Sequence, residues 1–157
     1  MSGQNGASRR YPERPLLGVG AVVFHAGKVL LIQRGTEPLK GWWTVPGGLV
    51  EVGERLEAAV RREALEETGL RVKPVAVAAL FQRIAPDMAG RTEFHHVIVD
   101  FLCELEDGAV RAASDVAQAG WFTPEESRQL QMAPGTAGVL ESALALRARR
   151  AAQREEA

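Results

Sequence analysis

The sequence contains little cysteine: Cys103 is the only one in 157 residues. A lone cysteine excludes an internal disulfide. Because Cys103 lies within an apolar stretch, we expect a buried structural thiol and not a catalytic nucleophile.

An excess of charge of one sign and long apolar runs are also missing. Lys and Arg number 19 and Asp and Glu 20, so the net charge is −1, without the basic excess typical of nucleic-acid-binding proteins. No apolar run reaches the roughly 18 residues of a membrane span, and the first residues lack the hydrophobic segment of a secretory signal. We therefore expect no nucleic-acid partner, no membrane association and a cytoplasmic protein.

The length of 157 residues suits one domain with its own core. We expect a flexible tail over residues 1–15, one domain over residues 16–150 and a C-terminal tail over residues 151–157. Strand patterns alternate with helix patterns, which favours an α/β architecture. The predicted strands are Leu17–Phe24, Lys28–Gln33, Arg71–Phe81, Glu93–Glu104 and Trp121–Phe122; a loop is predicted over Ala85–Arg91, and helices over Pro124–Gln131 and Ala137–Arg150.

What the sequence does have is a concentration of acid between residues 48 and 70, GLVEVGERLEAAVRREALEETGL. In a helix of about 100° per residue, Glu63 and Glu67 project about 20° to either side of Leu56, at the edge of the apolar arc or within it, and Glu66 flanks them. Carboxylates so spaced repel one another and lose hydration when partly buried. A divalent cation removes both costs. Since no Cys or His interleaves with the acids, Mg²⁺ or Mn²⁺ is the natural ion.

The residues around this helix support the same interpretation. Gly47 or Gly48 can bring a backbone carbonyl close to an ion, where a side chain would block the approach. The predicted helix runs from about Glu54, an acid at the positive end of the helix dipole, to Thr68, and Gly69 closes it. We expect a loop–helix–loop unit with its acids on one side.

This segment resembles the signature of the Nudix hydrolases, and roughly residues 16–131 resemble the family. In the signature, five residues separate a glycine from a glutamate, and seven further residues separate that glutamate from a block of Arg-Glu-aliphatic-any-Glu-Glu-any-Gly-aliphatic. Each specified position is filled, although Ala64 is small for an aliphatic position. The matching residues are Gly48, Glu54, Arg62, Glu63, Ala64, Leu65, Glu66, Glu67, Thr68, Gly69 and Leu70.

The resemblance implies a Nudix-type α/β/α sandwich with a mixed β-sheet, an Mg²⁺ cofactor with Mn²⁺ as substitute, a small-molecule nucleotide substrate and a homodimer. It implies that Glu63 and Glu67 are the primary side-chain ligands, that Glu66 is a further ligand or the base, and that the Gly47 carbonyl completes the site. Glu54 joins the catalytic set, with Arg62 as an orienter of Glu54 or Glu63.

The general base stays open. In several family members it comes from a loop near the final strand, where Asp115 is the best candidate. Val116 follows it, where related chains often carry Glu, and this departure leaves the identity of the base undecided.

The substrate prediction depends on residues outside the acidic helix. Pro86 stands sixteen residues after Leu70, a distance associated with the ADP-ribose pyrophosphatases of the family, although loops collect prolines in any case. We expect Pro86, Gly48 and Arg34 on the substrate side, with a surface ion pair as the alternative for Arg34. The predicted reaction converts ADP-ribose to AMP and ribose 5-phosphate. The alternatives are a MutT-type nucleoside triphosphate pyrophosphatase, a broad-range enzyme on nucleotide sugars or dinucleotides, and a nucleotide-sensing module without hydrolysis, which the retained acids disfavour.

Overall fold

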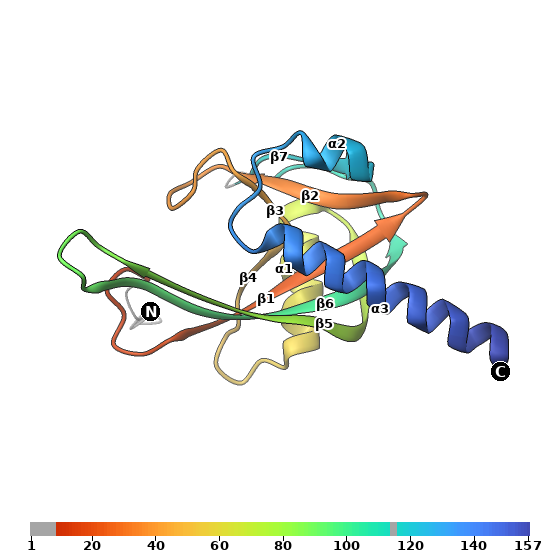
Figure 1. Ribbon diagram of the computed structural model, residues 1–157, viewed down its shortest axis with the longest axis horizontal. Coiled ribbons are helices and arrows are strands. Elements are labelled where there is room, and N and C mark those ends of the chain that lie inside the picture. The colour runs from red at the N-terminus through yellow and green to blue at the C-terminus, as the bar shows by residue number, and fades with distance from the viewer. Residues whose placement is uncertain (1–8, 114–115) are drawn as a thin grey trace, which may run out of the picture.

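A mixed β-sheet organises the chain (Figure 1). The computed structural model describes residues 9–113 and 116–157. The strand order is β3-β2-β1-β6-β5, with β4 on β1 and β7 on β2; β1 and β6 run parallel and the other named pairs antiparallel. The strands are β1 Leu16–His25, β2 Lys28–Arg34, β3 Trp43–Thr44, β4 Gly47–Leu49, β5 Arg71–Pro86, β6 Thr92–Asp107 and β7 Val116–Phe122.

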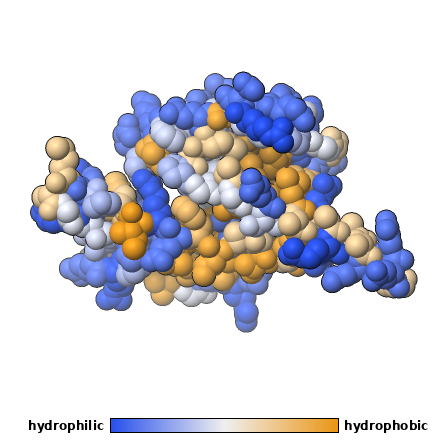
Figure 2. Space-filling model, viewed as in Figure 1, coloured by the Kyte–Doolittle hydropathy of each residue, from blue (hydrophilic) through white to orange (hydrophobic). Residues whose placement is uncertain are grey.

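Helices cover both faces of the sheet, which confirms the predicted α/β/α sandwich (Figure 1). Helix α1, Leu56–Thr68, packs through Ala59, Val60 and Ala64 on one core, and α3, Thr136–Glu156, packs on the other. Because successive strand residues point to opposite faces, β1 supplies both cores. On the face seen in Figure 2, hydrophobic residues gather across the middle, whereas the part over α2 and β7 is mostly hydrophilic.

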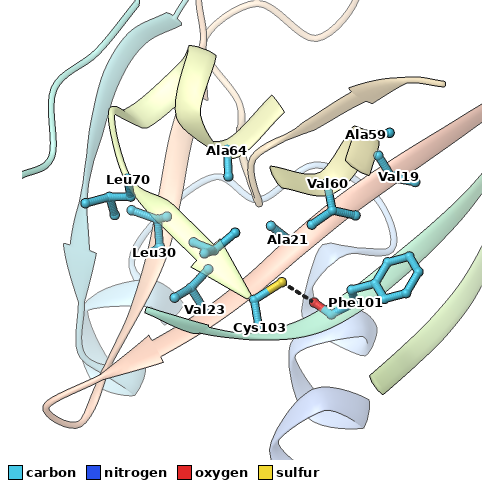
Figure 3. Packing of buried hydrophobic residues seen from close by; sticks show 11 residues of the cluster. Val19, Ala21, Val23, Leu30, Ala59, Val60, Ala64, Leu70, Phe101 and Cys103 are labelled. Carbon is cyan, nitrogen blue, oxygen red and sulfur yellow. Dashed lines mark hydrogen bonds between the residues drawn. The ribbon is translucent and has the colours of Figure 1, made fainter. Parts of the chain in front are cut away.

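The core beneath α1 contains the lone cysteine (Figure 3). Cys103 is 3% exposed, and its Sγ donates to the Phe101 carbonyl at 3.6 Å. Burial raises the pKa of this thiol to about 12. The prediction of a structural thiol is confirmed, since a group with this pKa is not ionised at neutral pH.

The β1–β2 hairpin joins two strands that the sequence predicted. Its two-residue turn is Ala26-Gly27, with φ of 51° and 76°, as in the primed turns that suit the twist of paired strands. In the α1 unit, Gly69 ends the helix at φ 76° with its N–H on the Leu65 carbonyl, as expected. The helix starts at Leu56, however, so Glu54 lies before it and not in its first turn.

The second hairpin is longer than the sequence predicted. Strands β5 and β6 pair as far as Pro86↔Thr92, so the predicted loop 85–91 shortens to residues 87–91. Backbone pairing with β6 carries the ladder through Ala85, which the proline-based prediction placed in a loop, and the register shifts between Ala85 and Pro86. The resulting ribbon extends beyond the body of the sheet (Figure 1).

The remaining boundaries also move. Strand β7 begins at Val116 and not near Trp121, and α2, Pro124–Arg128, is shorter than predicted, although its capping box on Thr123 is present. Helix α3 continues to Glu156 through the predicted C-terminal tail. In the predicted N-terminal tail, the backbone N–H of Tyr11 donates to the Glu93 carbonyl at 2.7 Å, so this described part lies against the ribbon. Among the described residues, no helix has the length and apolar character needed to cross a membrane.

Candidate active site

A cleft of about 1040 Å³ lies between the acidic side of α1 and the sheet. One wall consists of the β4 backbone and the α1 acids. The other consists of side chains from β2, β5 and β6 and from the start of α3. The predicted site residues on its lining are Arg34, Gly47, Gly48, Glu63, Glu66 and Glu67.

Arg62 organises the acidic wall. Its Nε and Nη2 donate to the two Glu54 carboxylate oxygens at 2.7 and 2.9 Å, and its Nη1 donates to Glu63 at 2.7 Å. A longer contact of 3.4 Å reaches Glu66, and Nη2 also donates to the Leu49 carbonyl at 3.1 Å. The planar guanidinium, a fork of five donors, thereby ties α1 to the loop before it. This matches the predicted orienting role.

Glu54 is tightly held. Besides Arg62, the backbone N–H of Glu51 donates to it at 3.1 Å. The Arg62 hydrogen bonds, followed by the Glu51 N–H, lower the pKa of Glu54 to about 2. A carboxylate with this pKa accepts protons poorly near pH 7. The geometry therefore favours Glu54 as the anchor of Arg62 over Glu54 as a base.

Glu63 and Glu67 face the glycine pair of β4. A Cβ at Gly48 would overlap the Glu63 carboxylate, so the absence of a side chain there makes room for it. The backbone N–H of Gly47 donates to Glu67 Oε2 at 3.4 Å, and Glu67 is 9% exposed. The glycines thus allow a closely packed junction between β4 and the acids of α1.

The donors at this junction suit Mg²⁺. They are carboxylate and backbone oxygens, the ligands that hard cations prefer. In the part of the chain that the structure describes, no three His, Cys, Asp or Glu side chains converge into a complete ligand set. An incomplete set fits Mg²⁺, which proteins usually bind through one or two carboxylates, with waters and substrate phosphates completing the shell.

The last two predicted residues are Asp115 and Pro86. Asp115, the candidate base, falls outside the described residues. Pro86 ends β5 at the far end of the ribbon, and the cleft lining among the described residues does not include it. A contact between Pro86 and substrate therefore gains no support from this geometry.

Arg34 stands on the wall opposite the acids. Its Nε donates to the Pro38 carbonyl at 2.7 Å, which fixes the guanidinium at the cleft. Burial lowers the pKa of Arg34. The attraction of Glu67 partly offsets this lowering, and repulsion by Arg83 and Arg9 adds to it. Arg34 thus faces both the acidic wall and further cations, and the alternative of a surface ion pair does not describe it.

Sequence reasoning missed most of the sheet wall. Alternate residues of β6 point to one face, and in the register with β5 His96 lies beside Arg83 and Ile98 beside Phe81. All four line the cleft. Burial, then the charges of Arg83, Arg9 and Arg34, lowers the pKa of His96, so this imidazole is neutral near pH 7. His95 instead contacts Gln82 at 3.1 Å, and as consecutive strand residues the two histidines face opposite sides.

Asp100 is the other residue that the sequence analysis overlooked. It follows the apolar run Val97-Ile98-Val99 in β6, is 3% exposed and lines the cleft. A carboxylate inside an apolar strand run was the available signal, because buried charge is rare without a purpose.

The comparisons with known proteins agree with this site. A family model described as the NUDIX domain matches residues 14–143. The ADP-ribose pyrophosphatase of Methanocaldococcus jannaschii is 35% identical over 69% of this chain and 62% of its own length, so the match spans less than two thirds of that protein. The CTP pyrophosphohydrolase of Escherichia coli is 34% identical over 85% of this chain and 95% of its own.

A solved structure, the MutT NUDIX hydrolase of Burkholderia pseudomallei, superposes with a TM-score of 0.73 at 30% identity, covering 83% of this chain and 98% of that one. The family model covers every named strand of the sheet and the whole acidic helix. The chain belongs to the Nudix family.

Proposed function

We propose that the protein hydrolyses the pyrophosphate bond of ADP-ribose to give AMP and ribose 5-phosphate, with Mg²⁺ as cofactor and Mn²⁺ as substitute. The observation that carries this proposal is the pairing of opposite charges across one cleft. Glu63, Glu66 and Glu67 form one side, and Arg34 and Arg83 form the other. A metal on the acidic side and cations on the other side would together hold a dianionic pyrophosphate.

The cleft also has the size for a substrate with groups on both sides of the pyrophosphate. Its volume of about 1040 Å³ lies at the upper end of ordinary small-molecule sites, about 300–1,000 Å³. The M. jannaschii relative, named an ADP-ribose pyrophosphatase, supports this substrate class.

The acids of this wall have different roles in the proposed reaction. Glu63 and Glu67, against the glycine backbone, would hold Mg²⁺, which when bound neutralises phosphate charge and lowers the pKa of a coordinated water. Glu66 is the best-placed base among the described acids, because its side chain is 59% exposed and its contact with Arg62 is 3.4 Å long. Glu54 serves to fix Arg62 and, through it, Glu63. Arg34 orients the pyrophosphate from the opposite wall.

The MutT-type alternative also has specific support. The E. coli CTP pyrophosphohydrolase aligns over 95% of its length, against 62% for the M. jannaschii protein. This favours the MutT-type alternative, release of pyrophosphate from a nucleoside triphosphate. The acidic helix serves either reaction, because it addresses a phosphoric anhydride whichever group leaves.

Analysis of the products distinguishes the two candidate functions. Purified protein would be incubated with Mg²⁺ and ADP-ribose, nucleotide sugars or nucleoside triphosphates, with a matched sample in excess chelator. We expect AMP and ribose 5-phosphate from ADP-ribose, no inorganic phosphate until a phosphatase is added, and no turnover in chelator. Pyrophosphate from triphosphates together with negligible AMP from ADP-ribose would contradict the proposal and establish the second function.

A further inference from the structure

Asp100 is a buried acid with no role in the chemistry described so far. It is 3% exposed, and no described residue forms a hydrogen bond or ion pair with it. An ionised carboxylate removed from water without a partner is costly. Burial is the cause that raises its pKa, to about 7. Because this carboxylate lines a binding cleft, we look for its hydrogen-bond partner in the ligand.

The fold makes space for this carboxylate. Asp100 lies beside Gly20 of β1 in the β1–β6 register, and a Cβ at Gly20 would overlap Asp100 Oδ1 and approach Val45 Cγ2 at 3.1 Å. Gly20 in turn pairs with Gly47 of β4. Asp100 therefore lies two strand spacings, about 10 Å, from the glycine that contacts Glu67. This separation leaves room for a ribose between the pyrophosphate and a group bound at Asp100.

The surroundings of Asp100 are mainly apolar. Phe81 and Ile98 adjoin it on β5 and β6, and Val45 and Val139 line the same cleft. Two hydroxyls, of Thr44 and Thr136, also line this cleft and contact each other at 3.3 Å. Flat apolar walls with one acceptor suit a planar heteroaromatic ring, whereas a second sugar would bring several hydroxyls that need partners.

We propose that Asp100 determines nucleobase specificity by accepting a hydrogen bond from the amino group of the substrate's base. An ionised carboxylate only accepts hydrogen bonds, so it favours adenine, cytosine or guanine, which carry amino groups. It disfavours hypoxanthine, which presents a carbonyl oxygen where adenine has the amino group. The inference rests on the proposed function, since the base is that of the nucleotide hydrolysed.

The test compares AMP with IMP, which has a carbonyl oxygen at C6 where AMP has the amino group, and a proton on N1 where AMP has none. Calorimetric titrations without metal at pH 8, above the pKa of Asp100, would use wild-type protein, Asp100→Asn and the control Asp107→Asn. Asp107 lies on the same strand but is exposed, with its side chain 70% accessible. We expect wild-type protein and the control to bind AMP at least about tenfold more tightly than IMP. In Asp100→Asn the ratio should fall to about one or invert, because an amide also donates.

A merely structural role would weaken both nucleotides equally and leave their ratio unchanged, and that result would overturn the proposal. Equal affinities in the wild type, or no binding of either nucleotide, would also overturn it. Should Asp100→Asn fail to fold, Gly20→Ala supplies a second variant, since its Cβ displaces the carboxylate and should also reduce the AMP/IMP ratio.

The binding test is independent of turnover. If ADP-ribose is not hydrolysed while wild-type protein prefers AMP and Asp100→Asn does not, the proposed substrate is wrong and the inference about Asp100 holds. If ADP-ribose is hydrolysed and the ratio is unchanged in Asp100→Asn, the proposed substrate holds and the inference about Asp100 is wrong.

Discussion

The two walls of the cleft are built in different ways. The acidic wall comes almost entirely from residues 47–67, and Arg62 links three of its acids, Glu54, Glu63 and Glu66. The sheet wall collects Arg34 from β2, Arg83 from β5, and His96 and Asp100 from β6. Its cations repel each other, and the carboxylate has no described partner. The contrast indicates that one short segment of sequence supplies the groups for hydrolysis. The groups that recognise the substrate are brought together by the register of the strands. Loss of either wall should therefore give a distinct defect.

The largest expected effect tests the acidic wall. Glu67→Gln removes one ligand charge at nearly constant volume and should reduce kcat for ADP-ribose by at least about a hundredfold at saturating Mg²⁺, since several kcal/mol of charge stabilisation disappears. Steady-state kinetics would measure the change. The matched control is Glu57→Gln, an exposed acid in the first turn of the same helix, which should retain wild-type turnover. A loss of less than tenfold in Glu67→Gln would sink the ligand assignment.

A smaller effect should follow from breaking the network that holds this wall together. Arg62→Ala frees Glu63 from its 2.7 Å contact, and a displacement of about 1 Å in a catalytic group can cost about a hundredfold. We expect kcat to fall by about ten- to a hundredfold. Arg62→Lys should be impaired as well, because one ammonium cannot replace the fork.

The control for this variant is the neighbouring residue. Arg61 pairs with Glu106 at the surface and is 49% accessible, so Arg61→Ala should behave like wild type. A metal-free AMP titration adds a readout that separates positioning from general damage. If Arg62→Ala lost AMP affinity and turnover together, the idea that the acidic wall acts apart from the sheet wall would be wrong.

The difference between the walls also explains what the sequence could predict. The spacing of Glu63, Glu66 and Glu67 within one helix is a local property, so residue spacing alone was enough to locate the acidic wall. The contact of Glu63 with Gly48 and the start of α1 after Glu54 needed the loop geometry. Asp100 and Arg83 come to line the same cleft through the pairing of two sixteen-residue strands, which no local pattern specifies.

The strand boundaries failed for a related reason. The residue type of Pro86 predicts a loop, yet backbone pairing continues to Thr92 and places this proline at the end of β5. Trp43 shows the opposite case. Packing on the core is the expectation for its large apolar ring, and it is 8% exposed with that ring 5.0 Å from the ring of Phe122.

The smallest expected effect concerns the stability of the sheet wall. The pKa of Asp100 is about 7 in the folded protein, against an ordinary value of 3.8. Between these values the folded state binds more protons than the unfolded state, so this group lowers the free energy of unfolding as pH rises from about 4 to 7. Asp100→Asn should remove that loss, with a gain on the order of 1–3 kcal/mol at pH 8 and little gain near pH 4.

Urea denaturation of both proteins at about pH 4.5, near the lower end of this range, and at pH 8, above it, would measure this gain. A stabilisation that is equal at the two pH values would show that packing, and not the buried charge, distinguishes the variant. A destabilised Asp100→Asn protein at pH 8 would show that the carboxylate has a partner that the described residues do not supply.

The most direct test of the division between the walls is the affinity of Glu67→Gln for AMP, measured by calorimetry without metal on the protein whose turnover has been lost. We predict a dissociation constant within about threefold of wild type and an unchanged preference for AMP over IMP, because the base is held on the sheet wall and the lost ligand acts on the pyrophosphate. A loss of AMP affinity comparable to the loss in kcat would contradict the division, since one set of residues would then perform both recognition and hydrolysis.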